Sequence, residues 1–189
     1  GEILVMTYPL IGNYGVPGKD KAGSLPAFFE SQKIHAKGLV VADYSHEYSH
    51  FEATRSLSEW LKEEGIPAIY GVDTRAITKI LRDTGTMLGA IVPGGSTKPR
   101  EFYDPGPDNL VAQVSVAEPL LYQRPSHKKK KRVVLVDCGA KLNIIRSLTA
   151  RGADVMRVPW DYDFTHDSYD GIVVSNGPGD PVTAHQTIQ

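Results

Sequence analysis

The sequence predicts an α/β fold in which an N-terminal α/β domain precedes the first part of a second domain built on a parallel sheet. Three segments, Arg132–Asp137, Asp154–Pro159 and Gly171–Ser175, carry consecutive Val, Ile, Leu or Met residues, which is typical of strands buried on both faces. A helical segment, Asn143–Arg151, separates the first two, and the glycine that follows it, Gly152, is a common helix terminator. This strand–helix–strand order predicts parallel strands with helices covering the sheet.

The first 92 residues show the same alternation of strands and helices. Strands are predicted over four segments: Ile3–Tyr8, Gly38–Asp43, Pro67–Val72 and Met87–Val92. Helices are predicted over three segments: Ser24–Gln32, Phe51–Glu64 and a stretch from Asp73 or Thr74 to Arg82. Ser24 and Ser49 are the expected N-caps of the first two helices, because a serine oxygen can accept a hydrogen bond from a first-turn amide. Gly65 and Gly85 are expected to end the second and third helices.

The middle of the chain, residues 93–131, shows few signs of regular structure. Pro93–Ser96 predicts a turn, and a short strand is expected near Val111–Val116. Lys128–Arg132 is a run of basic residues without interleaved aromatic residues, which favours a solvated linker over a nucleic-acid or localisation patch. The predicted organisation is a domain at 1–118, a basic linker at 119–131 and the start of a second domain at 132–189.

The composition is that of an ordinary globular chain: 189 residues, 41% hydrophobic and 23% charged, with a net charge of −1. This charge gives no general electrostatic reason to expect nucleic acid or an anionic membrane as a partner. No apolar run approaches the length of a membrane span. The single cysteine, Cys138, excludes an internal disulfide framework and fits a reducing compartment, so a cytoplasmic location is expected.

His46, Glu47 and His50 form the pattern H-E-x-x-H, which on a helix holds a zinc ion between two histidines beside a general-base glutamate. The nearest helix is predicted to begin only near Phe51, with Ser49 as its N-cap. His46 and Glu47 would then lie outside the helix, and the one-turn spacing of the ligands would be lost. We therefore expect surface or capping histidines and no metal site.

A turn-forming stretch, Ser175-Asn-Gly-Pro-Gly-Asp-Pro181, directly follows the last predicted strand. In an open parallel sheet, ligands bind beyond the carboxyl ends of the strands. Gly177 and Gly179 flank a proline, so backbone N–H groups could approach a bound carbonyl or anion without a side-chain wall. Such donors suit acyl-transfer chemistry, but Gly and Pro also punctuate ordinary turns. The spacing alone does not decide between the two interpretations.

Cys138 also ends a predicted strand, which raises the question of a catalytic nucleophile. No motif brings a histidine near it, and a lone cysteine is most often a small buried apolar residue. We therefore expect a structural role for Cys138.

Four segments carry more specific motifs. They are Leu-Val-Met-Thr-Tyr-Pro-Leu-Ile-Gly-Asn-Tyr-Gly at 4–15, Gly-Val-Asp-Thr-Arg-Ala-Ile-Thr at 71–78, Leu-Arg-Asp-Thr-Gly-Thr-Met-Leu-Gly at 81–89, and residues 132–181 with their Asn-Gly-Pro-Gly-Asp-Pro. The first three resemble the N-terminal domain of the small subunit of glutamine-dependent carbamoyl phosphate synthetase. The last resembles the opening of its class I glutamine amidotransferase domain. Asn-Gly-Pro-Gly-Asp-Pro alone fits several amidotransferases, whereas the combination is similar to this one synthetase family.

The resemblance implies a glutaminase. A cysteine thiolate attacks the side-chain amide of L-glutamine, a histidine–glutamate pair moves protons, and ammonia passes to a large synthetase component that uses ATP and Mg²⁺. That component, a separate subunit or a linked domain, makes carbamoyl phosphate from bicarbonate for pyrimidine or arginine synthesis. Gly177 and Gly179 match the family's glutamine-binding glycines, with the Gly177 N–H as the oxyanion donor. No cofactor is expected in this chain itself.

The resemblance also implies what these residues lack. The family's nucleophilic cysteine, histidine and glutamate are expected beyond Gln189, so the chain is expected to be a fragment without a catalytic residue. Some relatives keep the fold without the nucleophile and use free ammonia. For a member of the arginine or urea pathway, a mitochondrial location is the alternative to a cytoplasmic one. Asp161–Thr165 resembles that branch, whereas Asn176 and Asp180 favour an active glutaminase. Both alternatives stay open at the level of sequence.

Overall fold

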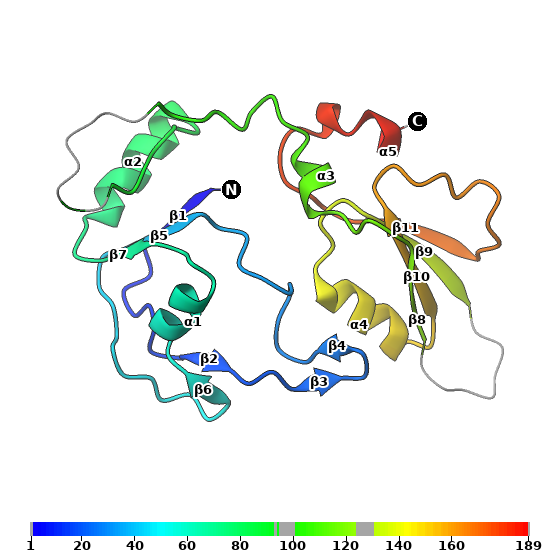
Figure 1. Ribbon diagram of the computed structural model, residues 1–189, viewed down its shortest axis with the longest axis horizontal. Coiled ribbons are helices and arrows are strands. Elements are labelled where there is room, and N and C mark those ends of the chain that lie inside the picture. The colour runs from blue at the N-terminus through cyan, green and yellow to red at the C-terminus, as the bar shows by residue number, and fades with distance from the viewer. Residues whose placement is uncertain (1, 93, 95–100, 124–130, 189) are drawn as a thin grey trace. The chain divides into compact units, whose positions relative to one another are not determined.

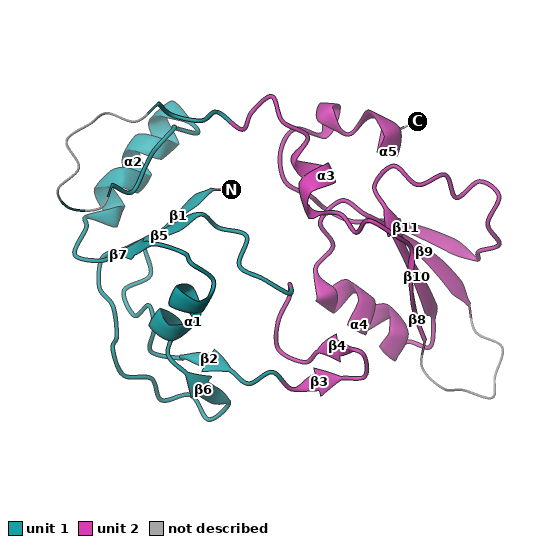
Figure 2. Cartoon of the chain, viewed as in Figure 1, with its two compact units in different colours: residues 1–19, 32–104 teal, residues 20–31, 105–189 magenta. Residues whose placement is uncertain are grey.

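The computed structural model describes residues 2–92, 94, 101–123 and 131–188. The chain forms two compact units (Figure 2). Unit 1 comprises residues 1–19 and 32–104, and unit 2 comprises residues 20–31 and 105–189. These units describe packing, and the domain boundaries expected from the sequence stay a prediction.

Unit 1 contains a three-stranded parallel sheet in the order β1-β5-β7 (Figure 1). The strands are β1 (Ile3–Met6), β5 (Gly38–Val41) and β7 (Ala68–Ile69), and the predicted strands at these places are confirmed. All of β5 is buried because it is the central strand, paired with a parallel neighbour on each edge. A two-stranded ladder of β2 (Val16–Pro17) and β6 (Ala53–Arg55) lies elsewhere in the unit.

The helices of unit 1 begin at side-chain caps. Helix α1 (Leu57–Glu63) starts at a capping box, in which the Ser56 Oγ accepts from the Glu59 N–H at 3.1 Å and Glu59 accepts from the Ser56 N–H at 2.7 Å. The expected start near Phe51 with a Ser49 cap is wrong, because the box satisfies two amides at once and Ala53–Arg55 is a strand. The following helix, α2 (Thr74–Thr84), is confirmed, with Asp73 as its N-cap and Gly85 as its C-cap.

One expected element of unit 1 is wrong. Residues 87–92, which follow α2, form no strand in the structure and pair with none of the described sheets. The turn predicted at Pro93–Ser96 falls outside the described residues except for Gly94, and most of the basic run at 128–132 lies outside them as well.

Unit 2 contains a four-stranded sheet in the order β11-β9-β10-β8 (Figure 1). Strands β9 (Arg132–Asp137), β10 (Asp154–Pro159) and β11 (Gly171–Val174) are parallel, as predicted, and α4 (Leu142–Ala150) connects the first two. Strand β8 (Leu120–Tyr122), which was not predicted, pairs antiparallel with β10. Strand β11 is an edge strand that is only half buried, so burial on both faces holds for β9 and much of β10 alone.

The strand expected near Val111–Val116 is wrong, because these residues form helix α3 (Leu110–Val114). The Asn109 side chain caps this helix by accepting from the Ala112 N–H at 2.9 Å. Val111, 4% exposed, packs against the sheet residues Val134 and Val158. The strand preference of the valines is therefore outweighed by the Asn109 cap and by the packing of Val111 in the core.

Residues 20–31, hereafter the arm, form an extended hairpin rather than the expected Ser24–Gln32 helix. Its strands are β3 (Lys21–Ala22) and β4 (Leu25–Pro26). Leu25, 6% exposed, packs into the core of unit 2 with Leu135 of β9 and Ile145 of α4. An isolated helix of nine residues is marginal in water, and the tertiary contacts of Leu25 favour the extended form.

The two faces of the unit 2 sheet carry separate apolar clusters. One cluster lies around Leu135, Val155 and α4, and the other lies around Val134, Val136 and α3. Two short helices, η1 (Pro181–Thr183) and α5 (His185–Ile188), follow the last strand, and Ala184 between them is buried in the second cluster. Among the described helices, none has the length and apolarity that a membrane crossing requires.

A buried ion pair lies at the carboxyl end of β9. The Asp137 Oδ2 accepts from Arg157 of β10, at 2.9 Å from Nε and 2.7 Å from Nη2, and from the Val116 N–H at 2.8 Å. Its Oδ1 accepts from the Gly139 N–H at 3.0 Å and from the Ala140 N–H at 2.7 Å. Both carboxylate oxygens are thus satisfied, which a charge with no exposed surface requires.

Arg157→Met is expected to destabilise unit 2 by about 3–5 kcal/mol, because the Asp137 charge would remain buried without its cation. The matched change Arg82→Met removes a guanidinium from an exposed pair and is expected to cost less than about 1 kcal/mol. Urea unfolding measures both, read through Trp160 for unit 2 and Trp60 for unit 1. Equal losses in the two variants would refute a special role for the buried pair.

Candidate glutamine-binding turn

The candidate site is formed by the segments that follow two adjacent parallel strands. Strands β9 and β11 pair in parallel, so their carboxyl ends lie at the same edge of the sheet. The first segment is residues 138–141, between β9 and α4, and the second is the turn at residues 175–180 after β11.

Ser175 joins these two segments. Its side chain is buried, and its Oγ accepts from the Cys138 N–H at 3.0 Å while donating to the Asn176 carbonyl at 2.9 Å. The Ser175 N–H donates to the Val136 carbonyl at 3.1 Å, which extends the β9–β11 ladder by one residue. The start of the turn is therefore held to the neighbouring strand by both main chain and side chain.

Gly177 is required by a close approach of two backbones. A Cβ built on this residue would lie 2.1 Å from the Cys138 carbonyl oxygen and 3.0 Å from the Cys138 carbonyl carbon. Real Cβ atoms do not approach a backbone so closely, so any side chain here would push the turn away from the end of β9.

Gly179 is required for a different reason. Its φ is +80°, in the left-handed region that residues with a Cβ rarely adopt. A Cβ would meet the Leu110 side chain at 3.4 Å, which is ordinary contact, so conformation rather than space selects glycine. Asp180 then caps η1 by accepting from the Val182 N–H at 2.9 Å.

The amides of Gly177 and Gly179 have no protein acceptor in the described part of the chain. Both residues are solvent-exposed. Two N–H donors without a protein acceptor in the described residues, on a turn held against Cys138, can bind a carbonyl oxygen, a carboxylate or a developing oxyanion.

Comparison with known proteins identifies the two parts of the chain. Residues 1–91 match the family model for the carbamoyl-phosphate synthase small chain, CPSase domain, and residues 134–189 match that for glutamine amidotransferase class-I. The chain thus joins a carbamoyl-phosphate synthase small-chain domain to class-I glutamine amidotransferase sequence. The resemblance drawn from the motifs and the predicted fold class are both confirmed.

Curated relatives match nearly the whole chain. It is 46% identical to the multifunctional protein URA2 of Saccharomyces cerevisiae over 211 residues and 50% identical to the multifunctional protein CAD of Squalus acanthias over 189 residues. It is also 50% identical over 192 residues to the mitochondrial carbamoyl-phosphate synthase (ammonia) of Homo sapiens. These alignments cover 96%, 99% and 100% of the chain, but it spans only 10%, 8% and 12% of the respective relatives.

Cys138 lies beside the candidate turn of the amidotransferase sequence, but its thiol is not poised to attack. The side chain is 6% exposed and belongs to an apolar core cluster. Burial raises the pKa of the thiol and outweighs the lowering by the Thr187 hydroxyl, which lies 3.9 Å from the sulfur, and the nearby Asp137 charge adds a smaller increase. A catalytic cysteine needs a lowered pKa, so the structure gives Cys138 a packing role.

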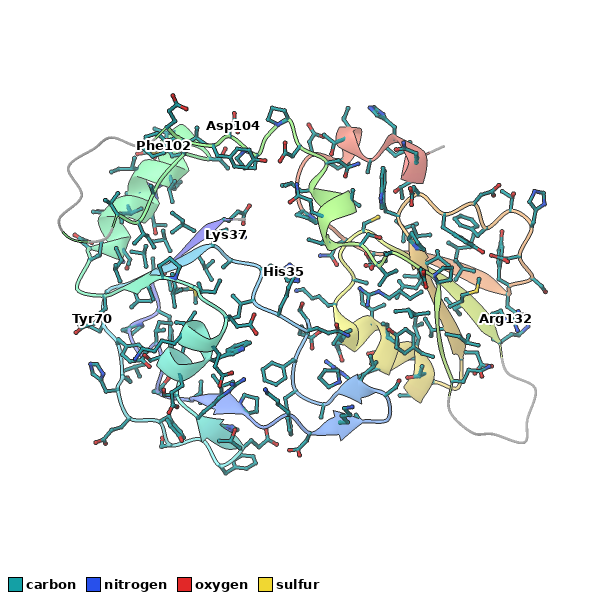
Figure 3. The ribbon with its side chains drawn as sticks, viewed as in Figure 1. His35, Lys37, Tyr70, Phe102, Asp104 and Arg132 are labelled. Atoms are coloured by element: carbon teal, nitrogen blue, oxygen red, sulfur yellow. The ribbon has the colours of Figure 1, made fainter. Side chains whose placement is uncertain are left out.

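The H-E-x-x-H segment lies in unit 1 and is not helical. His46 and Glu47 lie in a bend before β6, as expected, although Ser56 rather than Ser49 caps the helix that follows. The His46 ring contacts Tyr70, labelled in Figure 3, with a centroid distance of 6.0 Å, and the His50 ring stacks on a neighbouring phenylalanine. Within the described ranges, no group of three or more potential ligands is arranged to hold a metal ion.

Two residues that organise the candidate turn were not singled out from the sequence. Asp137 is the last residue of β9 and Ser175 directly follows β11, so each is a polar residue at the carboxyl end of an apolar run. That position was the available signal, but it does not show that Asp137 accepts hydrogen bonds from three separate segments or that Ser175 bridges to Cys138.

Native Cys138 is expected to react with the thiol reagent DTNB at least about tenfold more slowly than the same residue in urea, because burial and its raised pKa both suppress the thiolate. The release of thionitrobenzoate at pH 8 gives both rates. As the only cysteine, Cys138 needs no background substitution. Rapid reaction of the folded protein would contradict the packing role.

Proposed function

We propose that the chain is part of the glutaminase component of a carbamoyl phosphate synthetase. This component hydrolyses glutamine and passes ammonia to an ATP-dependent component that makes carbamoyl phosphate from bicarbonate. The observation that carries the proposal is the pair of amides at Gly177 and Gly179, unbonded within the described residues, in amidotransferase sequence at the end of a parallel strand.

The proposed task of these residues is to bind and orient L-glutamine. When a thiolate attacks the side-chain amide carbon, the carbonyl oxygen becomes negatively charged, and the Gly177 N–H donates to it. Gly179 supplies a second fixed donor on the same turn. Because the turn is held by Ser175 and by the contact with Cys138, these donors need no reorganisation during the reaction.

The attacking thiolate is proposed to come from outside these 189 residues. The only cysteine in the sequence is Cys138, whose buried, raised-pKa thiol is unsuited to nucleophilic attack. The histidine and glutamate that move protons are proposed to lie outside as well.

The proposed partner is a large synthetase component, either a separate subunit or a linked domain, and ATP and Mg²⁺ belong to that component. Linked domains are supported by the multifunctional relatives, of which this chain spans about a tenth. The product would serve pyrimidine or arginine synthesis. We propose a cytoplasmic location for a pyrimidine-pathway protein and a mitochondrial one for an arginine- or urea-pathway protein.

A second candidate function is a nucleophile-less amidotransferase-like domain with a structural or regulatory role in an ammonia-dependent synthetase. Its support is the 50% identity to a human relative named for ammonia, the same identity as to the shark CAD protein. The candidate turn alone does not separate the two functions, because its fold can persist without the thiol.

In the full-length protein, Gly177→Val is expected to lower glutamine-dependent carbamoyl phosphate formation by about 10²–10³-fold, because it displaces the proposed oxyanion donor. Ammonia-dependent formation should be unchanged. The matched control is Gly171→Val in β11, where a Cβ meets nothing within 4 Å. Equal loss of the two activities in Gly177→Val would contradict the assigned role.

The nitrogen source separates the two candidate functions. With glutamine labelled at the amide with ¹⁵N as the only source, a glutaminase produces labelled carbamoyl phosphate, whereas the nucleophile-less alternative produces none. Labelled ammonium should enter the product in both cases and serves as the control. Mass spectrometry of the product, trapped as carbamoylated aspartate or ornithine, measures the label.

A further inference from the structure

The arm belongs to unit 2 although the sequence on both sides of it belongs to unit 1. It is anchored at its tip by Leu25, which is buried against Leu135, Leu142 and Ile145. A segment more than 100 residues away in the chain thus completes the core beneath α4.

Glu30, near the end of the arm, supplies the N-terminal cap of α4. The N-cap residue of this helix, Lys141, makes no capping bond with its own side chain. Instead the Leu142 N–H donates to the Glu30 carbonyl at 2.9 Å, and the Asn143 N–H donates to the Glu30 carboxylate at 3.0 Å. A carboxylate here also interacts favourably with the helix dipole.

Arg146 ties the same part of the arm to the helix. Its Nη1 donates to the carbonyls of Pro26 at 2.8 Å and Phe29 at 2.9 Å, and its Nη2 pairs with the Glu30 carboxylate at 2.5 Å. Arg146 is largely buried, with 16% of its side chain exposed, so water competes weakly for these bonds.

The helix start that Glu30 caps adjoins the candidate turn. Residues 138–141 connect β9 to α4 and contact the turn directly. A Cβ on Gly139 would lie 3.3 Å from Pro178 and 3.5 Å from the Gly177 Cα, and the Cys138 carbonyl is the group against which Gly177 packs. A shift at the start of α4 is therefore expected to move the turn, because Gly177 packs closely against the Cys138 carbonyl.

We propose that Glu30 is a positioning residue for glutamine, which acts by fixing the start of α4 and thereby the Gly177 turn. This inference rests on the proposed glutaminase function for its substrate, and on the arm contacts alone for its structural part. The placement of the turn would then depend on the arm, which is joined to unit 1 residues at both of its ends.

In the full-length protein, Glu30→Ala is expected to raise the KM for glutamine about tenfold, with kcat changed less and the ammonia-dependent rate unchanged, because the lost bonds involve a charged group. Glu30→Gln keeps an acceptor for the Asn143 N–H and should recover most of the wild-type KM. Lys21→Ala, at an exposed arm position in β3, is the matched control and should match wild type.

Amide hydrogen exchange tests the structural part without any activity. In Glu30→Ala, exchange should accelerate not only at Asn143, which loses its acceptor, but also at Cys138, Gly139 and Ala140, whose acceptors are Ser175 and Asp137 and not Glu30. Amides of β5 in unit 1 should be unaffected. If Glu30→Ala does not fold, Glu30→Gln provides the same comparison with a smaller acceleration.

The two measurements separate the outcomes. Unchanged exchange at 138–140, or an unchanged KM in an active protein, would overturn the positioning role. A wild-type protein without glutamine-dependent activity would overturn the proposed function, whereas accelerated exchange at 138–140 would still support the arm's hold on the turn.

Discussion

The architecture of unit 2 depends on the buried pair of Asp137 and Arg157. One carboxylate receives the guanidinium from the neighbouring strand, the Val116 amide beyond α3, and the Gly139 and Ala140 amides that lead into α4. Burying this charge is unfavourable unless every lone pair finds a donor. Removal of any of these donors would leave the buried charge less well satisfied, so the carboxylate favours the arrangement in which these segments converge on it. The hydrogen bonds to Asp137 hold residues 139 and 140 directly after β9, beside the contact between Cys138 and Gly177.

The candidate turn combines two kinds of glycine requirement in three residues. Gly177 allows two backbones to touch, and Gly179 allows a left-handed turn. Both requirements are structural, yet the N–H groups of these two exposed glycines have no protein acceptor in the described chain. Structure and ligand binding are thus not competing explanations of the motif, because the packing that excludes a side chain at Gly177 also holds its N–H donor in place.

Because of the arm, unit 2 is built from two separate stretches of the sequence, residues 20–31 and 105–189. Leu25, Glu30 and Arg146 make an early segment part of the core and the helix cap of the amidotransferase unit. Loss of that cap is expected to increase local opening at residues 138–141 more than in the strands, because the loop has fewer backbone hydrogen bonds than the sheet. A glutamine-using protein and an ammonia-using relative could share this scaffold, since none of its contacts requires a thiol nucleophile.

The sequence by itself determined β9 and β10 to the residue, the position of α2, and the turn with its two glycines, because apolar runs, an aspartate cap and Gly-Pro spacing are local signals. Only the tertiary structure decided that Leu25 lies in an extended arm and that Val111 lies in a helix. Both segments have weak or conflicting local preferences, and the free energy of burying an apolar side chain against a distant sheet exceeds such preferences. The same holds for Asp137 and Ser175, whose partners are adjacent only after the strands have paired.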